Sequence, residues 1–366
     1  MGKKFRVAII GTGMIGSTAH APAWTSLTDD VEVVATADIL PERAESVAVG
    51  FDIPNHYGDW EKMLKEMQPD IVSVCTPNCY HKSITIAALK SGAHVCCEKP
   101  IAPGYADAKE MYDVAESVGR ELFITQTSRF NGNALAAKEY ADSGMLGEMY
   151  YAETGTLRRR GVPKWGVFHI KKHNAGGPIY DLGVHDLDLF LWVMGAPKVT
   201  AVSGQAVLKF ANKDENLATS LFDSGADAGL LFEPLPYDYR DFDVEDFASG
   251  YMRLENGGSL VLRTSWAANV QQGAGSSFIL GTEGGLMFNP LRYISNQGRY
   301  MSDSLPQVPR TSGQAFSGHF MHHAHAIKVL RGEEEKIVKR EEVLNVIRAL
   351  DALYESAEVG HEVTID

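Results

Sequence analysis

The chain has 366 residues, of which 45% are hydrophobic and 22% charged, and its formal net charge is −13. This length exceeds one ordinary hydrophobic core and fits two domains, while the composition excludes a disordered or fibrous protein. The acidic balance argues against nucleic acid or an anionic membrane as the main partner. No apolar run approaches the length of a membrane span, and the start has no signal-peptide layout. A cytoplasmic protein is therefore expected.

A glycine-rich turn follows the first apolar segment. Residues 5–20, FRVAIIGTGMIGSTAH, read as a β-branched strand, a turn with the pattern G-x-G-x-x-G and the start of a helix. In that setting glycines permit a tight turn and close approach of a pyrophosphate, and the helix N-terminus holds the phosphates. A tight turn without a ligand is the alternative interpretation. The residues predicted to contact a dinucleotide here are Gly11, Gly13, Met14, Ile15 and Gly16.

The second expected strand, 31–38, ends on an acidic residue. Asp38 is placed to accept hydrogen bonds from a ribose 2′-hydroxyl and to repel a 2′-phosphate. The first arginine after it is Arg43, so no basic residue follows immediately to hold a phosphate. The sequence therefore favours NAD over NADP as the cofactor.

Three further apolar segments, 71–77, 93–100 and 121–126, alternate with helical patterns. This alternation predicts a parallel sheet covered by helices on both faces. Ligands of such sheets bind beyond the carboxyl ends of the strands, where TPN (76–78) and EKP (98–100) lie. The residues predicted to bind the cofactor in these regions are Thr76, Pro77, Asn78, His81, Glu98, Lys99 and Gln126.

The four cysteines, Cys75, Cys79, Cys96 and Cys97, all lie in this first third. Neighbouring residues on a strand point to opposite faces, so Cys96 and Cys97 make a poor pair of metal ligands. Disulfides are rare in cytosolic proteins. Buried, reduced thiols are expected.

A second group of ionisable residues lies in 180–188, YDLGVHDLD, which continues into the apolar LFLWVMG. Read as one α-helix that starts near Pro178, the segment places Asp181, His185 and Asp188 on one face at i, i+4 and i+7. Such groups are costly to bury without partners. They therefore face either partners in the core or a cleft in which protons are transferred.

Three stretches together resemble the family of glucose-fructose oxidoreductase, inositol dehydrogenase and the rhizopine-catabolism protein (Gfo/Idh/MocA): GTGMIG, CTPNCYHKSITIAALKSGAHVCCEKPIA and GGPIYDLGVHDLDLFLWVMG. The resemblance covers nearly the whole chain. It implies an α/β fold, with a Rossmann NAD-binding domain over 1–126 and an α+β domain over 127–366. The second domain would hold a large, open, mainly antiparallel sheet that often serves to form homo-oligomers.

The same resemblance assigns the reacting residues. In this family the Lys of an E-K-P motif and the Asp and His of a D-x-x-x-H motif surround the nicotinamide and the substrate hydroxyl, and they match Lys99, Asp181 and His185. Oxidation of a secondary alcohol also requires a base for the hydroxyl proton and a donor for the developing alkoxide. His185, of a residue type that titrates near neutrality, is the predicted general acid/base, Lys99 polarises the oxygen, and Asp181 orients the pair. Asp188 is expected to anchor a neighbouring segment.

A loop over 156–178 returns to the helix of His185 and carries many polar side chains. Trp165 offers a flat face to sugar C–H groups, and Arg160 and His169 can bond to oxygens, so these three are predicted to bind substrate. At least half of the basic residues in this loop are expected to neutralise the cofactor or to face solvent. Residues 211–243 are expected to form an irregular insertion.

A histidine cluster closes the set of candidate sites, with His319, His322, His323 and His325 in one helical pattern. No acidic residue lies between them, and the family resemblance supplies no metal, so no metal site is predicted. An interface or pocket rim and a plain helix surface remain as alternatives.

The sequence thus predicts an NAD-dependent dehydrogenase that oxidises a secondary hydroxyl of a sugar, cyclitol or glycoside, with no nucleic acid or membrane partner and with homo-oligomers expected. One rival is a glycosidase, or a glycoside-oxidising enzyme of the same fold, that forms a transient or stable keto-sugar. Another class of rival is a non-catalytic sugar or dinucleotide sensor. A sensor would not require Lys99, Asp181 and His185 together.

Overall fold

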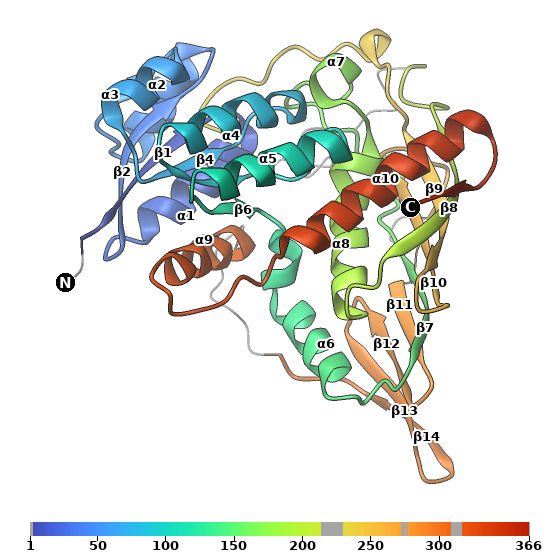
Figure 1. The fold of residues 1–366 in the computed structure, drawn as a ribbon. Coiled ribbons are helices and arrows are strands. Elements are labelled where there is room, and N and C mark those ends of the chain that lie inside the picture. The colour runs from blue at the N-terminus through green and yellow to red at the C-terminus, as the bar shows by residue number, and fades with distance from the viewer. Residues whose placement is uncertain (1–2, 214–229, 272–274, 276, 309–316, 366) are drawn as a thin grey trace.

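The computed structural model describes residues 3–213, 230–271, 275, 277–308 and 317–365, which form two sheets with helices packed around them (Figure 1). The first sheet is parallel, with six strands in the order β3-β2-β1-β4-β5-β6. Its strands are β1 (Phe5–Ile10), β2 (Val31–Ala37), β3 (His56–Tyr57), β4 (Ile71–Val74), β5 (His94–Cys97) and β6 (Leu122–Ile124). The helices around it are α1 (Ala21–Ser26), α2 (Pro41–Gly50), α3 (Trp60–Met67), α4 (His81–Lys90) and α5 (Tyr105–Ser117). The predicted Rossmann topology is confirmed.

Both faces of this sheet are buried, as the continuous apolar strands predict. Cys97 belongs to the core on one face, and its neighbour Cys96 belongs to the core on the other. All four cysteines are free thiols, and three of them are buried. Burial raises the pKa values of the Cys75, Cys96 and Cys97 thiols, so these side chains stay protonated and act as core residues.

The second sheet has nine strands in the order β14-β13-β12-β11-β7-β10-β9-β8-β15. Among the ladders that the described residues form in this sheet, only the β7–β10 pairing is parallel, so the expected large, mainly antiparallel sheet is confirmed. The strands are β7 (Met149–Thr154), β8 (Val199–Val207), β9 (Phe247–Leu254), β10 (Ser259–Ser265), β11 (Ser277–Gly281), β12 (Gly284–Phe288), β13 (Arg292–Gln297), β14 (Tyr300–Ser304) and β15 (Val363–Thr364). The helices of this half are α6 (Gly132–Asp142), α7 (Lys171–Asn174) and α8 (Val184–Val193).

The last two helices connect the two halves. Helix α9 (Ser317–Leu330) packs beside α1, and its Ala326 and Ile327 complete one core of the first sheet (Figure 1). Helix α10 (Arg340–Val359) contributes to the core of the second sheet and also packs against α5. The chain therefore returns to its N-terminal half after it has built the second sheet.

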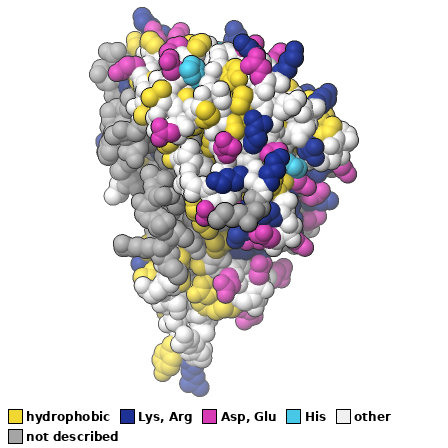
Figure 2. Space-filling model, turned by 90° about the vertical axis from the view of Figure 1, so that its left-hand side faces the viewer, with side chains coloured by type: hydrophobic (Ala, Val, Ile, Leu, Met, Phe, Trp, Pro, Cys, Tyr) yellow, Lys and Arg dark blue, Asp and Glu magenta, His cyan; other side chains and the backbone are white. Residues whose placement is uncertain are grey.

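Two further segments bear on the sequence predictions. Of the expected insertion 211–243, residues 214–229 lie outside the described residues, and the rest contains one short 3₁₀ turn, Tyr239–Asp241. Hydrophobic side chains appear at the lower end of the molecule in Figure 2. The β13–β14 hairpin extends from the sheet at this end (Figure 1). Its Tyr300 and Met301 are 78% and 90% exposed. In the part of the chain that the structure describes, no helix is both long and apolar enough to cross a membrane.

Candidate active site

The glycine turn after β1 has the geometry of a dinucleotide-binding loop. Gly11 has a φ of 89°, and a Cβ there would lie 2.7 Å from the carbonyl carbon of Cys75. A Cβ on Gly16 would lie 2.1 Å from the carbonyl oxygen of Gly11, so the helix and the turn are too close for any side chain. A Cβ on Gly13 would meet no atom within 4 Å, because Gly13 faces a cavity. The three glycines thus make the turn, the close packing and the open face that a pyrophosphate requires.

This cavity has a volume of about 660 Å³ and is lined by residues from both halves of the chain. The first half contributes the glycine turn, the end of β2 and the loops after β4 and β5. The predicted cofactor residues that line it are Gly11, Gly13, Met14, Ile15, Asp38, Thr76, Pro77, Asn78, Glu98 and Lys99. A cavity at the carboxyl ends of parallel strands, with this turn in its wall, fits a dinucleotide.

Asp38 is held at the rim by backbone amides. Its Oδ2 accepts a hydrogen bond from the Thr12 N–H at 2.8 Å, and its Oδ1 accepts one from the Leu40 N–H at 2.9 Å. Arg43 also lines the cavity, and its guanidinium carbon lies 4.5 Å from the centre of the Phe232 ring. The carboxylate is thus fixed in the position from which it would reach a ribose.

Three of the predicted cofactor residues do not line the cavity: Gly16, His81 and Gln126. The His81 ring is buried between two loops, with Nδ1 at 2.8 Å from the Pro100 carbonyl oxygen and Nε2 at 2.7 Å from that of Thr76. It therefore ties the loop after β4 to the loop after β5. Gln126 is 1% exposed and is also absent from the cavity wall.

Lys99 and Asp181 meet inside the cavity from opposite halves of the chain. Lys99 Nζ donates to the Asp181 carbonyl oxygen at 3.0 Å and lies 3.4 Å from its Oδ1. The other carboxylate oxygen, Oδ2, accepts a hydrogen bond from Trp266 Nε1 at 2.8 Å. Burial alone would raise the pKa of Asp181, but the charges of Lys99 and Arg158 and the Trp266 hydrogen bond hold it below its usual value. Asp181 is therefore an ionised and doubly anchored carboxylate.

The helix that carries these groups is not a regular α-helix throughout. Ile179–Gly183 forms a π-helical turn, and α8 begins only at Val184. The predicted polar face is therefore split, because a π turn contains an extra residue. Glu245 caps this turn by accepting hydrogen bonds from Gly177 N at 3.0 Å and Ile179 N at 3.1 Å. Trp266 and Glu245 were not predicted as site residues, since neither lies in a recognisable motif.

Asp188 lies away from the cavity, as expected. Its carboxylate is fully buried and receives two hydrogen bonds from Arg129, at 2.8 and 2.6 Å. Arg129 also pairs with Glu342 of α10. The predicted anchoring role of Asp188 is thus consistent with a buried ion pair that joins three segments.

His185 does not titrate near neutrality in the folded protein. Burial, together with the charge of Lys99, lowers the pKa of His185 to about 3. Its Nδ1 is buried and has no hydrogen-bond partner among the described residues. His185 is therefore a neutral imidazole near Lys99 and Asp181, and the expectation of a near-neutral pKa was wrong because it took no account of burial.

The three predicted substrate residues lie in different environments. Trp165 lines the cavity and packs edge-on against Phe168. Arg160 donates to the Ala268 carbonyl oxygen at 3.1 Å and to Asn269 Oδ1 at 3.2 Å, and it is not in the cavity wall. His169 is buried against the Tyr237 ring, also outside the wall. The structure brings other polar groups of this loop to the cavity, namely His173 and Asn174.

His173 and Asn174 also connect the two halves across the cavity. Tyr80 Oη lies 2.9 Å from His173 Nδ1, and Asn78 Nδ2 donates to the Asn174 carbonyl oxygen at 3.0 Å. Both halves of the cavity wall are thus joined by hydrogen bonds.

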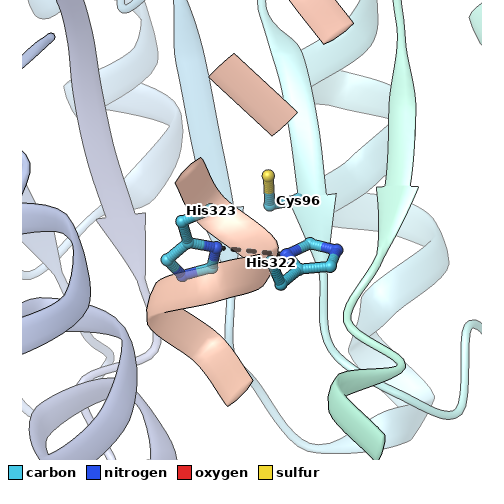
Figure 3. Close-up of side chains that lie close together, drawn as sticks. All are labelled: Cys96, His322 and His323. Carbon is cyan, nitrogen blue, oxygen red and sulfur yellow. Dashed lines mark hydrogen bonds between the residues drawn. The ribbon is translucent and has the colours of Figure 1, made fainter. Parts of the chain in front are cut away.

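The four histidines of α9 are buried rather than on a helix surface. His319, His322, His323 and His325 are 6%, 1%, 0% and 7% exposed, because α9 packs on the first sheet. His322 and His323 lie beside Cys96 of β5, with their Nδ1 atoms 3.2 Å apart (Figure 3). His319 Nε2 lies 3.2 Å from Glu98 Oε1, on the cavity wall. An acidic partner exists after all, but it comes from a strand end 221 residues away.

The glycine turn, the cavity and the Lys99–Asp181 pair together define a dinucleotide-dependent oxidoreductase with two α/β parts. Residues 5–126 match the model of the oxidoreductase family with an NAD-binding Rossmann fold, and residues 138–365 match that of its C-terminal alpha/beta domain. The chain belongs to this Gfo/Idh/MocA family and carries its NAD-binding domain.

Several proteins of known name are similar over most of the chain. D-glucoside 3-dehydrogenase of Escherichia coli K12 is 32% identical over 98% of this chain and 97% of its own length. Myo-inositol 2-dehydrogenase of Thermotoga maritima is 27% identical over 60% of this chain and 66% of its own length. A structure of levoglucosan dehydrogenase with NADH and levoglucosan covers all of both chains with a TM-score of 0.81 at 20% identity, which shows a shared fold.

Proposed function

We propose that this protein is an NAD-dependent dehydrogenase that oxidises a secondary hydroxyl of a sugar, cyclitol or glycoside. The observation that carries the proposal is the pairing of Lys99 with Asp181 inside the cavity that the glycine turn lines. The similarity to D-glucoside 3-dehydrogenase makes the C3 hydroxyl of a D-glucoside the first substrate to test. A boundary at residue 126, a homo-oligomer and a cytoplasmic location remain predictions.

The side chains of the cavity suit the proton part of this reaction. Bound NAD supplies the hydride acceptor. Lys99 Nζ would donate to the substrate oxygen and stabilise its developing negative charge, while Asp181, itself held by the Trp266 N–H, keeps Nζ in place. His185 is not itself part of the cavity wall, but it lies near Lys99 and Asp181, and its ring, kept neutral by burial, has a nitrogen that would accept the hydroxyl proton. Trp165 presents an aromatic face in the wall, which suits the C–H groups of a sugar ring.

A substrate panel tests this proposal. The purified protein is incubated with NAD and a set of inositols, aldoses and D-glucosides, and reduced nicotinamide is followed by its absorbance. Turnover of at least one member, lost in Lys99→Ala, is the expected result. Release of an aglycone without net reduction would instead indicate the glycosidase. Absence of turnover across the panel, together with sugar-dependent binding of a macromolecular partner, would indicate the sensor.

A further inference from the structure

Glu98 is a buried carboxylate in the wall of the cavity, directly after β5. It is 5% exposed, and three N–H groups from different segments point at it. Its Oε1 lies 2.8 Å from His20 Nε2 and 3.2 Å from His319 Nε2, and its Oε2 accepts from the Lys99 backbone N–H at 3.2 Å. Although burial alone would raise the pKa of Glu98, the hydrogen bonds from His20 and His319 hold it well below its usual value. Glu98 is therefore ionised.

The hydrogen-bond pattern around His20 fits a neutral imidazole. Its Nε2 faces Glu98, and its Nδ1 lies 2.7 Å from Ser73 Oγ, which accepts a hydrogen bond from Trp24 Nε1 at 3.1 Å. Ser73 can thus donate its hydroxyl proton to Nδ1 while His20 donates from Nε2 to Glu98. Burial lowers the pKa of His20, in agreement with this arrangement. His20 therefore holds Glu98 by a hydrogen bond without neutralising its charge.

The charges at this end of the cavity do not balance within the described residues. Glu98 has ion-pair contacts with His20 and His319 but with no lysine or arginine. The nearby Lys99 is paired with Asp181. A buried carboxylate is costly, so a site whose carboxylate faces no lysine or arginine gains when a permanent cation binds against it.

We infer that Glu98 is an electrostatic selector for the oxidised cofactor, and that His20 and His319 are the positioning residues that aim its carboxylate. The inference rests on the proposed function only in placing the nicotinamide beside Lys99. The nicotinamide ring is a cation in NAD⁺. It becomes neutral when a hydride, with its electron pair, leaves the substrate carbon for the ring, while the hydroxyl proton leaves separately to a base. Glu98 therefore attracts the ring before the reaction and loses this attraction after it.

A bound metal ion is the rival source of positive charge. The ligand atoms of His20, Glu98 and His319 lie within 4.8 Å of one another, as do those of the neighbouring Cys96, His322 and His323 (Figure 3). In the first group, hydrogen bonds already account for both nitrogens of His20 and for both oxygens of Glu98. We therefore assign the positive charge that faces Glu98 to the nicotinamide ring of the cofactor. The metal content of the purified protein is measured in the same experiment.

The test compares the dissociation constants of NAD⁺ and NADH without any sugar, by calorimetry and nicotinamide fluorescence. In Glu98→Gln we expect the preference for NAD⁺ over NADH to fall about tenfold or more, since a charge pair several ångströms apart at an effective dielectric constant of about 20 is worth at least this factor. Asp246→Asn is the matched control, because Asp246 is likewise a buried carboxylate held by several N–H groups but lies outside the cavity wall. In Asp246→Asn the ratio of the NAD⁺ and NADH dissociation constants should stay at the wild-type value.

A second pair of variants tests the positioning role of α9. His319→Leu removes the N–H donor to Glu98 and should shift the ratio of the NAD⁺ and NADH dissociation constants towards that of Glu98→Gln. His319→Gln keeps an N–H donor and should return this ratio to the wild-type value. An unchanged ratio in Glu98→Gln, or equal weakening of both nucleotides, would overturn the inference. So would a stoichiometric divalent metal in the wild-type protein that His319→Leu loses. Because no substrate is present, a wrong sugar assignment leaves the outcome unaffected.

Discussion

At the scale of single residues, the site depends on how each oxygen of Asp181 is used. One oxygen faces Lys99, 82 residues earlier in the chain, and the other accepts from Trp266, 85 residues later. The motifs E-K-P and D-x-x-x-H could identify Lys99 and Asp181 from the sequence alone. Trp266 could not be identified in that way, because a tryptophan at the end of a strand is more often a core residue.

His185 provides the first residue-scale prediction. His185→Ala should lower kcat by about 10²- to 10⁴-fold, the usual contribution of a positioned acid or base. The dissociation constant of NAD should stay within about twofold, since His185 is not part of the cavity wall. Steady-state kinetics and nucleotide titration measure the two effects. An unaltered kcat would rule out the assigned proton transfer.

Asp38 provides the second residue-scale prediction. Asp38→Ala removes the negative charge at the cavity rim, so the preference for NAD over NADP should fall by about tenfold or more. The exposed Glu42 in the first turn of α2 offers a control, because Glu42→Ala changes the net charge equally but lies outside the cavity wall. Titration with both nucleotides measures the ratio. The same preference in both variants would show that Asp38 does not contact the ribose.

At the scale of elements, the segment that carries Asp181 and His185 is held at both ends. Glu245 and Tyr354 fix the π turn at its start, where Glu245 Oε1 accepts a hydrogen bond from Tyr354 Oη at 2.9 Å. Asp188 and Arg129 fix α8 one turn after His185. The apolar pattern of 187–193 could predict a buried helix but not the π turn, which depends on Glu245 from another strand region.

The Arg129–Asp188 pair leads to a prediction of stability. Asp188→Asn leaves the buried Arg129 charge with Glu342 as its one carboxylate partner among the described residues, so the free energy of unfolding should fall by about 3 kcal/mol. The double variant Arg129→Met, Asp188→Leu removes the two fully buried charges and leaves only Glu342, whose side chain is 17% exposed and reaches water, so it should recover much of that loss. Urea unfolding followed by circular dichroism measures both. If the double variant is as unstable as the single one, the buried pair itself, rather than the orphaned charge, supplies the stability.

At the scale of the whole molecule, α9 returns to the first sheet and buries its histidines there. Its His322 and His323 are buried like His20 and His81, and His185 is partly buried. Burial lowers the pKa values of His20, His81 and His323, and it lowers those of His185 and His322 to about 3. These groups stay neutral in the folded protein at pH values where the unfolded chain would protonate them.

The protein should therefore lose stability in mild acid. The folded-state pKa values lie below the unfolded value of 6.5, so between the two the unfolded chain binds more protons, and the free energy of unfolding falls as the pH falls from 7 towards 4. Each such histidine contributes a slope of about 1.4 kcal/mol per pH unit. His322→Gln should reduce the slope by one such amount, and His361→Gln, at an exposed position, should not. Urea unfolding at several pH values measures the slopes, and equal slopes in all three proteins would refute the account.

The sequence by itself determined the parallel sheet, the glycine turn, the acid at the end of β2 and the family, because these follow from local patterns of apolar residues and from short motifs. It also identified Lys99, Asp181 and His185 as candidates. Only the tertiary structure decided what surrounds them. Trp266 bonds to Asp181, and burial lowers the pKa of His185. Arg160 and His169 lie outside the cavity wall, and Glu98 contacts His319. The physical reason is that burial and hydrogen bonding between distant segments depend on how the two sheets and α9 pack, and no local pattern encodes that packing.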